Sequence, residues 1–151
     1  MSTDLAAQTA ATTATAASET PLTIPVAIVG FGWMGRVHAQ AYARIRHHFP
    51  TLHPVPQLTV IADELADRAG EAARQFGVDA VVTDWRDVVS DNSIAAVSVT
   101  APNFLHREIG VAVASAGKHL WIEKPVGLTA ADARAVACLL YTSDAADERS
   151  S

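Results

Sequence analysis

Three glycines at a spacing suited to phosphate binding follow the first apolar run of the sequence. Residues 25–29 have the composition of a buried strand, and Gly30-Phe31-Gly32-Trp33-Met34-Gly35 comes directly after them. In such a strand–turn–helix unit, the first glycine permits the tight turn, the second lets a pyrophosphate approach, and the third lets the helix pack closely. The helix N-terminus adds amide donors and partial positive charge. The motif therefore predicts a dinucleotide site, and the plainer alternative is an ordinary tight turn.

An acidic residue ends the second predicted strand. Asp63 follows residues 58–62, where a carboxylate can accept hydrogen bonds from ribose hydroxyls and would repel a 2′-phosphate. No arginine stands directly beside it in the sequence, so NAD is favoured over NADP. The separation from Gly35 exceeds the usual spacing of about 20 residues, and we attribute the excess to a proline-rich loop at residues 47–56. The alternatives are that Asp63 only caps the next helix, or that Glu64 serves in its place.

Two later loops carry polar residues directly after apolar strands. Residues 100–106 follow the predicted strand 95–99, and Glu123-Lys124-Pro125 follows the predicted strand 119–122. The carboxyl ends of parallel strands meet at one edge of a sheet, where open α/β sheets bind their ligands. We therefore expect both loops to lie at the same edge as the glycine motif.

The elements that position these residues alternate between strands and helices. Apolar, β-branched runs predict strands at 25–29, 58–62, 80–82, 95–99 and 119–122. Periodic segments predict helices at 34–46, 65–76, 86–89 and 105–116, with a last helix starting at Thr129 and capped by Asp132. Gly77 is expected to end the second helix, and Trp121 is expected in the sheet core. Continuous apolar strands separated by helices predict an α/β fold with a doubly wound parallel sheet.

The composition excludes several functional classes. The 151 residues suffice for one domain, and the net charge of −5 with only two lysines leaves no basic face for nucleic acid. No apolar run reaches the 18 or so residues that span a bilayer, so no membrane association is predicted. A single cysteine fits a reducing, cytoplasmic environment. The histidines of the 47–56 loop lack a carboxylate or cysteine at ligand spacing, so no metal site is predicted.

The two ends of the chain differ from its middle. Residues 1–24 are rich in alanine and threonine and are predicted to form a disordered tail. The first basic residue is Arg36, which argues against a targeting peptide. Residues 138–151 resemble the translation of a sequencing adapter, which makes them a predicted non-native tail; a natural polar tail is the alternative. Residues 25–137 then form the predicted dinucleotide-binding domain.

Several motifs in one order resemble the Gfo/Idh/MocA oxidoreductase family. They are the glycine motif followed by His38, the acid Asp63, the Pro102-Asn103-x-x-His106 loop, and Gly117-Lys118-His119 leading into Glu123-Lys124-Pro125. The resemblance covers residues 25–139, the amino-terminal half of such an enzyme. It implies a Rossmann NAD(P)-binding fold and a second α/β substrate domain, missing here, that carries the usual catalytic histidine.

The resemblance also implies a role for each matching residue. Lys124 would be the catalytic residue, near both nicotinamide and the reacting hydroxyl, where its ammonium stabilises developing alkoxide charge. The alternative is a solvated lysine in a turn, and Pro125 is often preceded by a cis peptide in this family. The implied cofactor-binding residues are Gly30, Phe31, Gly32, Trp33, Met34, Gly35, Asp63, Thr100, Pro102, Asn103, His106, Glu123 and Lys124.

The function implied by the resemblance is hydride transfer between NAD(P) and a secondary alcohol or ketone of a sugar, inositol or related polyol. We expect the chain alone to bind NAD without turnover, and the full-length protein to be a homo-oligomer. Two alternatives are a stand-alone nucleotide-binding module with a regulatory or redox-sensing role, and a methyltransferase. Lys124 argues against both, because neither chemistry requires a cation there.

Overall fold

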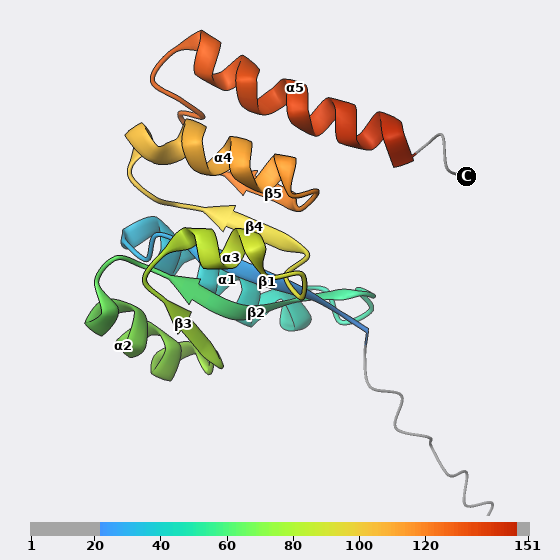
Figure 1. Ribbon diagram of the computed structural model, residues 1–151. Helices are drawn as coiled ribbons and strands as arrows, with labels where there is room; N and C mark the ends of the chain where they lie inside the picture. Colours follow the sequence, from blue (N-terminus) through green and yellow to red (C-terminus); the bar gives the residue numbers. More distant parts are fainter. Residues whose placement is uncertain (1–21, 148–151) are drawn as a thin grey trace, which may run out of the picture.

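A five-stranded parallel sheet forms the centre of the molecule (Figure 1). The computed structural model describes residues 22–147. The strand order is β3-β2-β1-β4-β5, and the strands are β1 (Thr23–Val29), β2 (Val55–Ala62), β3 (Ala80–Val82), β4 (Ala96–Val99) and β5 (His119–Ile122). The chain runs outward from β1 to β3 and then returns to place β4 on the other side of β1. This reversal of direction puts a topological switch point between β1 and β4.

Helices cover both faces of the sheet because successive side chains of β1 point to opposite faces. Ile28 packs in one core with residues of α1 (Trp33–His48) and α2 (Ala66–Phe76). Val29 packs in a second core with residues of α3 (Trp85–Ser90) and α4 (His106–Ser115), which a short 3₁₀ turn, η1 (Asn103–Leu105), precedes. The helix α5 (Ala130–Asp147) packs on α4. The predicted doubly wound parallel sheet is confirmed.

The helix ends follow the predicted capping signals. Gly77 adopts φ 66°, the left-handed conformation that ends many helices, and its N–H donates to the carbonyl of Ala73. At the start of α5, the Asp132 N–H donates to Thr129 Oγ1 at 3.2 Å, and the Thr129 N–H donates to the Asp132 carboxylate at 3.0 Å. These reciprocal bonds form the predicted capping box.

The proline-rich loop is shorter than the sequence predicts. His47 and His48 belong to α1, and Pro56 lies inside β2. The Val55 N–H donates to the Leu22 carbonyl at 3.1 Å, so the nitrogen of Pro56 faces the opposite side of the strand. There β3 pairs with β2 only from Val60 onward. The missing N–H of proline therefore removes no ladder bond.

Trp121 is not in the sheet core, contrary to the sequence prediction. Its side chain is 60% exposed, because β5 is the edge strand of the sheet. Its ring lies against the His38 ring of α1, with centroids 5.1 Å apart.

The ends of the described segment bear on the predicted tails. β1 begins at Thr23, so residues 23 and 24 are strand and not tail. Residues 1–21 and 148–151 lie outside the described residues. The helix α5 continues past Cys138, and the non-native origin of residues 138–151 stays a prediction. Of the helices described, none combines the length and the apolar character needed to cross a membrane.

Candidate functional site

The glycine motif forms the turn between β1 and α1, at the carboxyl edge of the sheet. Gly30 adopts φ 88°, and a Cβ at this position would lie 2.6 Å from the Cα of Ala101 in the loop after β4. A Cβ on Gly35 would collide with the Gly30 carbonyl. Both residues must therefore be glycine for the two loops to meet and for α1 to start close to the strand.

Gly32 is glycine for a different reason. No heavy atom of the described residues lies within 4 Å of the position that its Cβ would take. Gly32 is also the N-cap of α1, and among the described residues no side chain caps this helix. The space and the unused amides of the first helical turn fit a pyrophosphate, which needs close backbone approach and N–H donors.

Asp63 ties the glycine loop to the start of α2. One carboxylate oxygen accepts the Phe31 N–H at 2.6 Å, and the other accepts the Leu65 N–H at 2.9 Å. The second oxygen also bonds Arg68 Nη2 at 2.6 Å. The carboxylate thus stands at the end of β2, as predicted, and also serves the local structural role that was its alternative.

The charge of Asp63 is set by opposing effects. Burial raises the pKa of this carboxyl, but the hydrogen bonds from Arg68, Leu65 and Phe31 together hold the pKa below its usual value. The group is therefore ionised at neutral pH. Its side chain is 1% exposed, whereas that of Arg68 is 40% exposed.

Arg68 corrects the prediction that no arginine stands beside Asp63. It lies five residues along the chain, in the first turn of α2, and the turn of the helix brings it back to the strand end. An arginine in the first turn after the second strand is the signal that reveals it. The partial neutralisation of Asp63 weakens the argument that its charge excludes a 2′-phosphate.

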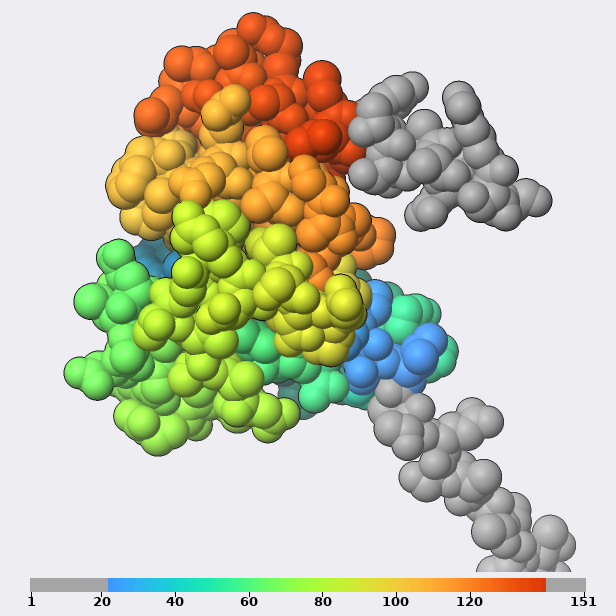
Figure 2. Space-filling model, in the orientation of Figure 1, coloured from blue at the N-terminus to red at the C-terminus, as the bar shows by residue number. Residues whose placement is uncertain are grey.

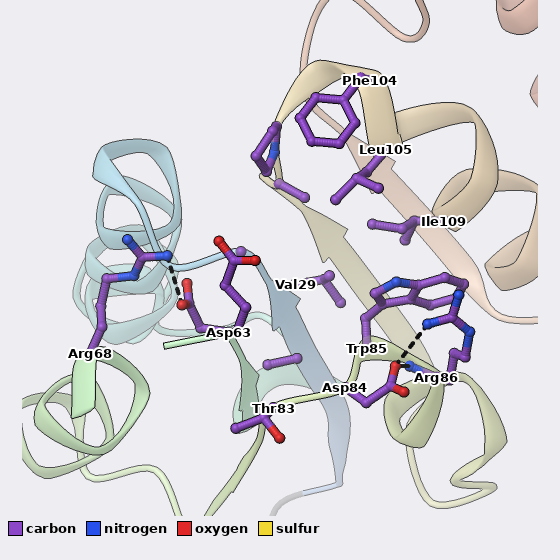
Figure 3. A pocket seen from close by; sticks show the side chains of 15 residues that line it. Val29, Asp63, Arg68, Thr83, Asp84, Trp85, Arg86, Phe104, Leu105 and Ile109 are labelled. Atoms are coloured by element: carbon purple, nitrogen blue, oxygen red, sulfur yellow. Dashed lines mark hydrogen bonds and ion pairs between the residues drawn. The ribbon is translucent and has the colours of Figure 1, made fainter. Parts of the chain in front are cut away.

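A cavity of about 370 Å³ opens at this edge, between the loops after β2, β3 and β4 (Figure 3). Figure 2 shows the corresponding hollow between the green segment after β2 and the gold segment after β4. Three of the residues expected to bind the cofactor line it, namely Gly30, Asp63 and Pro102, and so does Glu64, the alternative ribose ligand. Arg68 and the pair Trp85–Arg86 also line the cavity, and the sequence analysis did not assign them to the site. The Arg86 guanidinium lies 4.4 Å from the Trp85 ring centroid, so this side of the cavity combines a flat aromatic ring with a positive charge.

The loop after β4 contacts the glycine turn directly. Thr100 Oγ1 donates to the carbonyl oxygens of Gly30 and Val29, the latter at 3.3 Å. Asn103 presents a buried side-chain oxygen that has no hydrogen-bond partner among the described atoms. An unpaired buried acceptor is costly, so this oxygen fits a donor supplied by a ligand.

The turn after β5 carries Glu123 and Lys124. His38 Nε2 lies 3.0 Å from the Glu123 carboxylate, and this hydrogen bond is the main reason that the pKa of Glu123 is lowered. Lys124 follows with an exposed side chain and precedes a cis peptide to Pro125. His106 does not point to open space: its two ring nitrogens contact the carbonyls of Ala101 and Pro125.

The chain matches the description "Oxidoreductase family, NAD-binding Rossmann fold" over residues 24–145. The chain belongs to the Gfo/Idh/MocA oxidoreductase family. Among its relatives, levoglucosan dehydrogenase of Pseudarthrobacter phenanthrenivorans is 40% identical over 111 residues, which are 74% of this chain and 28% of that protein. Inositol 2-dehydrogenase of Salmonella typhimurium is 31% identical over 116 residues, 76% of this chain and 32% of that protein.

Solved structures agree with this assignment. A levoglucosan dehydrogenase complex with NADH is 37% identical, with a TM-score of 0.76, and the match covers 79% of this chain and 32% of that one. An NAD-binding oxidoreductase from Klebsiella pneumoniae is 32% identical, with a TM-score of 0.76, and the match covers 81% and 32% of the two chains. The chain thus spans about a third of the length of the Gfo/Idh/MocA relatives it matches.

Proposed function

We propose that this chain is the NAD-binding part of a dehydrogenase that exchanges a hydride with a secondary alcohol or ketone of a sugar, inositol or related polyol. The observation that carries the proposal is the meeting, at the β1–β4 switch point, of a glycine turn with open space at Gly32 and an ionised, buried Asp63. The open turn suits the pyrophosphate, and the carboxylate suits the ribose hydroxyls. The sugar and inositol dehydrogenases among the relatives support the substrate class.

The implied cofactor residues fall into two groups along the edge of the sheet. The glycine turn and Asp63 would hold the pyrophosphate and adenosine half. Asn103 and Lys124, in the loops after β4 and β5, would face the nicotinamide half, where the buried Asn103 oxygen can accept a hydrogen bond. When bound, the nicotinamide supplies the acceptor or donor of the hydride.

Lys124 is the residue that we assign to the proton chemistry. A hydride leaves a carbon only as the hydroxyl on that carbon loses its proton, so the oxygen becomes alkoxide-like. An ammonium beside that oxygen stabilises the developing charge. Glu123 precedes Lys124 in the chain, and its carboxylate is hydrogen-bonded to His38 Nε2 of α1 at 3.0 Å, which ties the turn to that helix.

The test is nucleotide binding by the 151-residue chain, measured by NADH fluorescence and by the melting temperature. A ligand at about 100 times its Kd stabilises the folded state by about 2.7 kcal/mol, so a melting shift of several degrees is expected with NADH. S-adenosylmethionine should give no shift, which separates the proposal from a methyltransferase. Absence of NADH binding would overturn the proposal.

A second measurement concerns turnover. The matched segments are 28% and 32% of the lengths of these two relatives, so we propose that the substrate pocket needs residues beyond those described. The chain should bind NAD⁺ yet produce no steady NADH from inositol or levoglucosan. Steady NADH production would show that the chain is a complete catalyst.

A further inference from the structure

His106 is a buried histidine that contacts two neighbouring loops. The residue is 2% exposed and is the first residue of α4. Its Nδ1 lies 2.8 Å from the carbonyl oxygen of Pro125, and its Nε2 lies 2.8 Å from the carbonyl oxygen of Ala101. The ring therefore spans from the loop after β4 to the turn after β5. Both nitrogens are occupied, so the side chain acts on these loops and has no nitrogen free for a cofactor.

The identity of the two partners restricts the chemistry of the ring. A carbonyl oxygen only accepts hydrogen bonds, so each ring nitrogen must donate. A neutral imidazole has one N–H, and its other nitrogen would turn a lone pair toward a carbonyl oxygen. Rotating the ring by half a turn would place carbon atoms against both oxygens. The doubly protonated ring is the form that satisfies both contacts.

Two effects oppose a cation at His106. Burial disfavours the charged form of the ring, and the positive end of α4 disfavours a positive charge at its first residue. The hydrogen bonds to two carbonyl oxygens offset these effects, because a neutral ring would turn a lone pair toward one of the oxygens. The described charged or titratable side chains on α4 and on the segments around it are Arg86, Asp87, Arg107, Glu108, His119, Glu123, Lys124, Asp132, Arg134 and Cys138. Three of the carboxylates already have cationic partners: Glu108 pairs with Arg86, Asp132 with Arg107, and Glu123 with His38.

Two buried histidines thus hold the residues on either side of Lys124. His38 of α1 holds the Glu123 side chain, and His106 of α4 holds the Pro125 carbonyl. We propose that His106 is a positioning residue that, as an imidazolium, ties the loops after β4 and β5 together and so places Lys124 beside the nicotinamide. This inference rests on the proposed function, because it assigns a device that orders the same site.

The protonation state can be read without a variant. A ¹⁵N–¹H spectrum of the ring nitrogens distinguishes the doubly protonated histidine from each neutral tautomer. Because both ring nitrogens face carbonyl oxygens, we expect His106 to show the doubly protonated pattern, and the signals of the exposed His119 are recorded in the same spectrum for comparison. A neutral tautomer at His106 would overturn the assignment, whether or not the chain binds NADH.

The positioning role is tested by chemical labelling of Lys124. The chain has two lysines, and Lys118 is buried, so an amine reagent reports on Lys124 when its peptide is analysed by mass spectrometry. With NADH at about ten times its Kd, a Lys124 that is completely shielded in the complex is labelled roughly eleven times more slowly than in the free chain. In His106→Gln we expect most of this protection to be lost, with NADH still bound through the glycine turn and Asp63. His119→Gln is the matched control and should keep the full protection.

The outcomes separate the two proposals. If the native chain does not bind NADH, the proposed function fails while the ¹⁵N result still decides the state of His106. The two variants are compared with NADH at the same multiple of each variant's own Kd. If the native chain binds NADH, and bound NADH protects Lys124 in His106→Gln as well as it does in His119→Gln, the positioning role is refuted. The melting temperature of each variant is measured in parallel. If His106→Gln does not fold, His106→Asn replaces it, and the ¹⁵N spectrum of the native chain remains decisive.

Discussion

The substitution Asp63→Asn tests the central residue of the cofactor site. In the native chain the carboxylate accepts two main-chain N–H bonds, at 2.6 Å from Phe31 and 2.9 Å from Leu65, and is 1% exposed. An asparagine has one acceptor oxygen and one NH₂ group, so either orientation places a donor against a donor. Leaving one buried N–H without an acceptor costs about 1 to 3 kcal/mol. The bond to Arg68 adds little, since an arginine that is 40% exposed is well screened.

The expected loss of stability is therefore about 2 kcal/mol, or roughly 6 to 8 °C in melting temperature for a domain of this size. For NADH, losing a charged acceptor of ribose hydroxyls should cost another 2 kcal/mol or so, which weakens Kd about thirtyfold. Fluorescence titration at a temperature where both proteins are folded measures this change. Glu64→Gln is the matched control, because Glu64 lines the same cavity with an exposed side chain and, among the described residues, makes no hydrogen bond to the glycine loop. A large loss of affinity in Glu64→Gln, with little in Asp63→Asn, would refute the assignment of Asp63 as the ribose ligand.

Four further outcomes follow from the same geometry. Gly30→Ala places a Cβ 2.6 Å from the Ala101 backbone at a positive φ, so it should lower stability by about 2 kcal/mol or more and abolish NADH binding; native-like melting would contradict this. Lys118→Met leaves two main-chain carbonyls without the buried ammonium that bonds them at 2.6 and 2.8 Å, and chemical denaturation should show a loss of about 2 to 4 kcal/mol. The pKa of Asp63 is lowered by folding, so its contribution is complete above the usual carboxyl pKa and is lost as pH falls below about 4; Asp63→Asn should flatten that part of the stability profile. Arg68→Gln removes the cation beside Asp63, so NADP⁺ binding should weaken about threefold more than NAD⁺ binding, and equal changes would contradict a role in reading the 2′-position.

Local sequence signals predicted the elements well because each signal acts over a few residues. The αL conformation of Gly77 and the Thr129–Asp132 capping box involve neighbours in the chain, and both appear where the sequence placed them. The doubly wound sheet was predicted from a pattern of the same local kind, because each strand is a short continuous apolar run and a helix separates it from the next. The start of β2 was missed because a proline usually interrupts a strand. A strand accepts Pro56 only where its nitrogen faces a side without a pairing neighbour, and which side is unpaired depends on the whole sheet.

The side-chain partners of the site were harder to predict because they depend on directions in space. Sequence order placed Asp63 and Lys124 at the ends of strands. The bond from Arg68 to Asp63 was missed because it joins residues five positions apart, although an arginine in the first turn of α2 is a signal that could have indicated it. In the same way, the position of His106 after β4 suggested contact with a ligand, whereas its ring lies between two carbonyls. The exposure of Trp121 follows from the place of β5 at the edge of the sheet, and the sequence analysis did not assign an order to the strands.

The loops at the carboxyl edge are joined by side-chain bonds that follow the order of the strands. Asp63, after β2, bonds the glycine turn after β1. Thr100, after β4, bonds the same turn at Gly30, and His106 bonds the loop after β4 to the turn after β5. Each bond crosses between adjacent strands, so the four loops form one connected set along the site. Preorganised groups act on a bound ligand without a further ordering cost. A loosened bond at one end of this set should therefore be felt at the other, which is why the Lys124 labelling measurement should also be made in Asp63→Asn at saturating NADH.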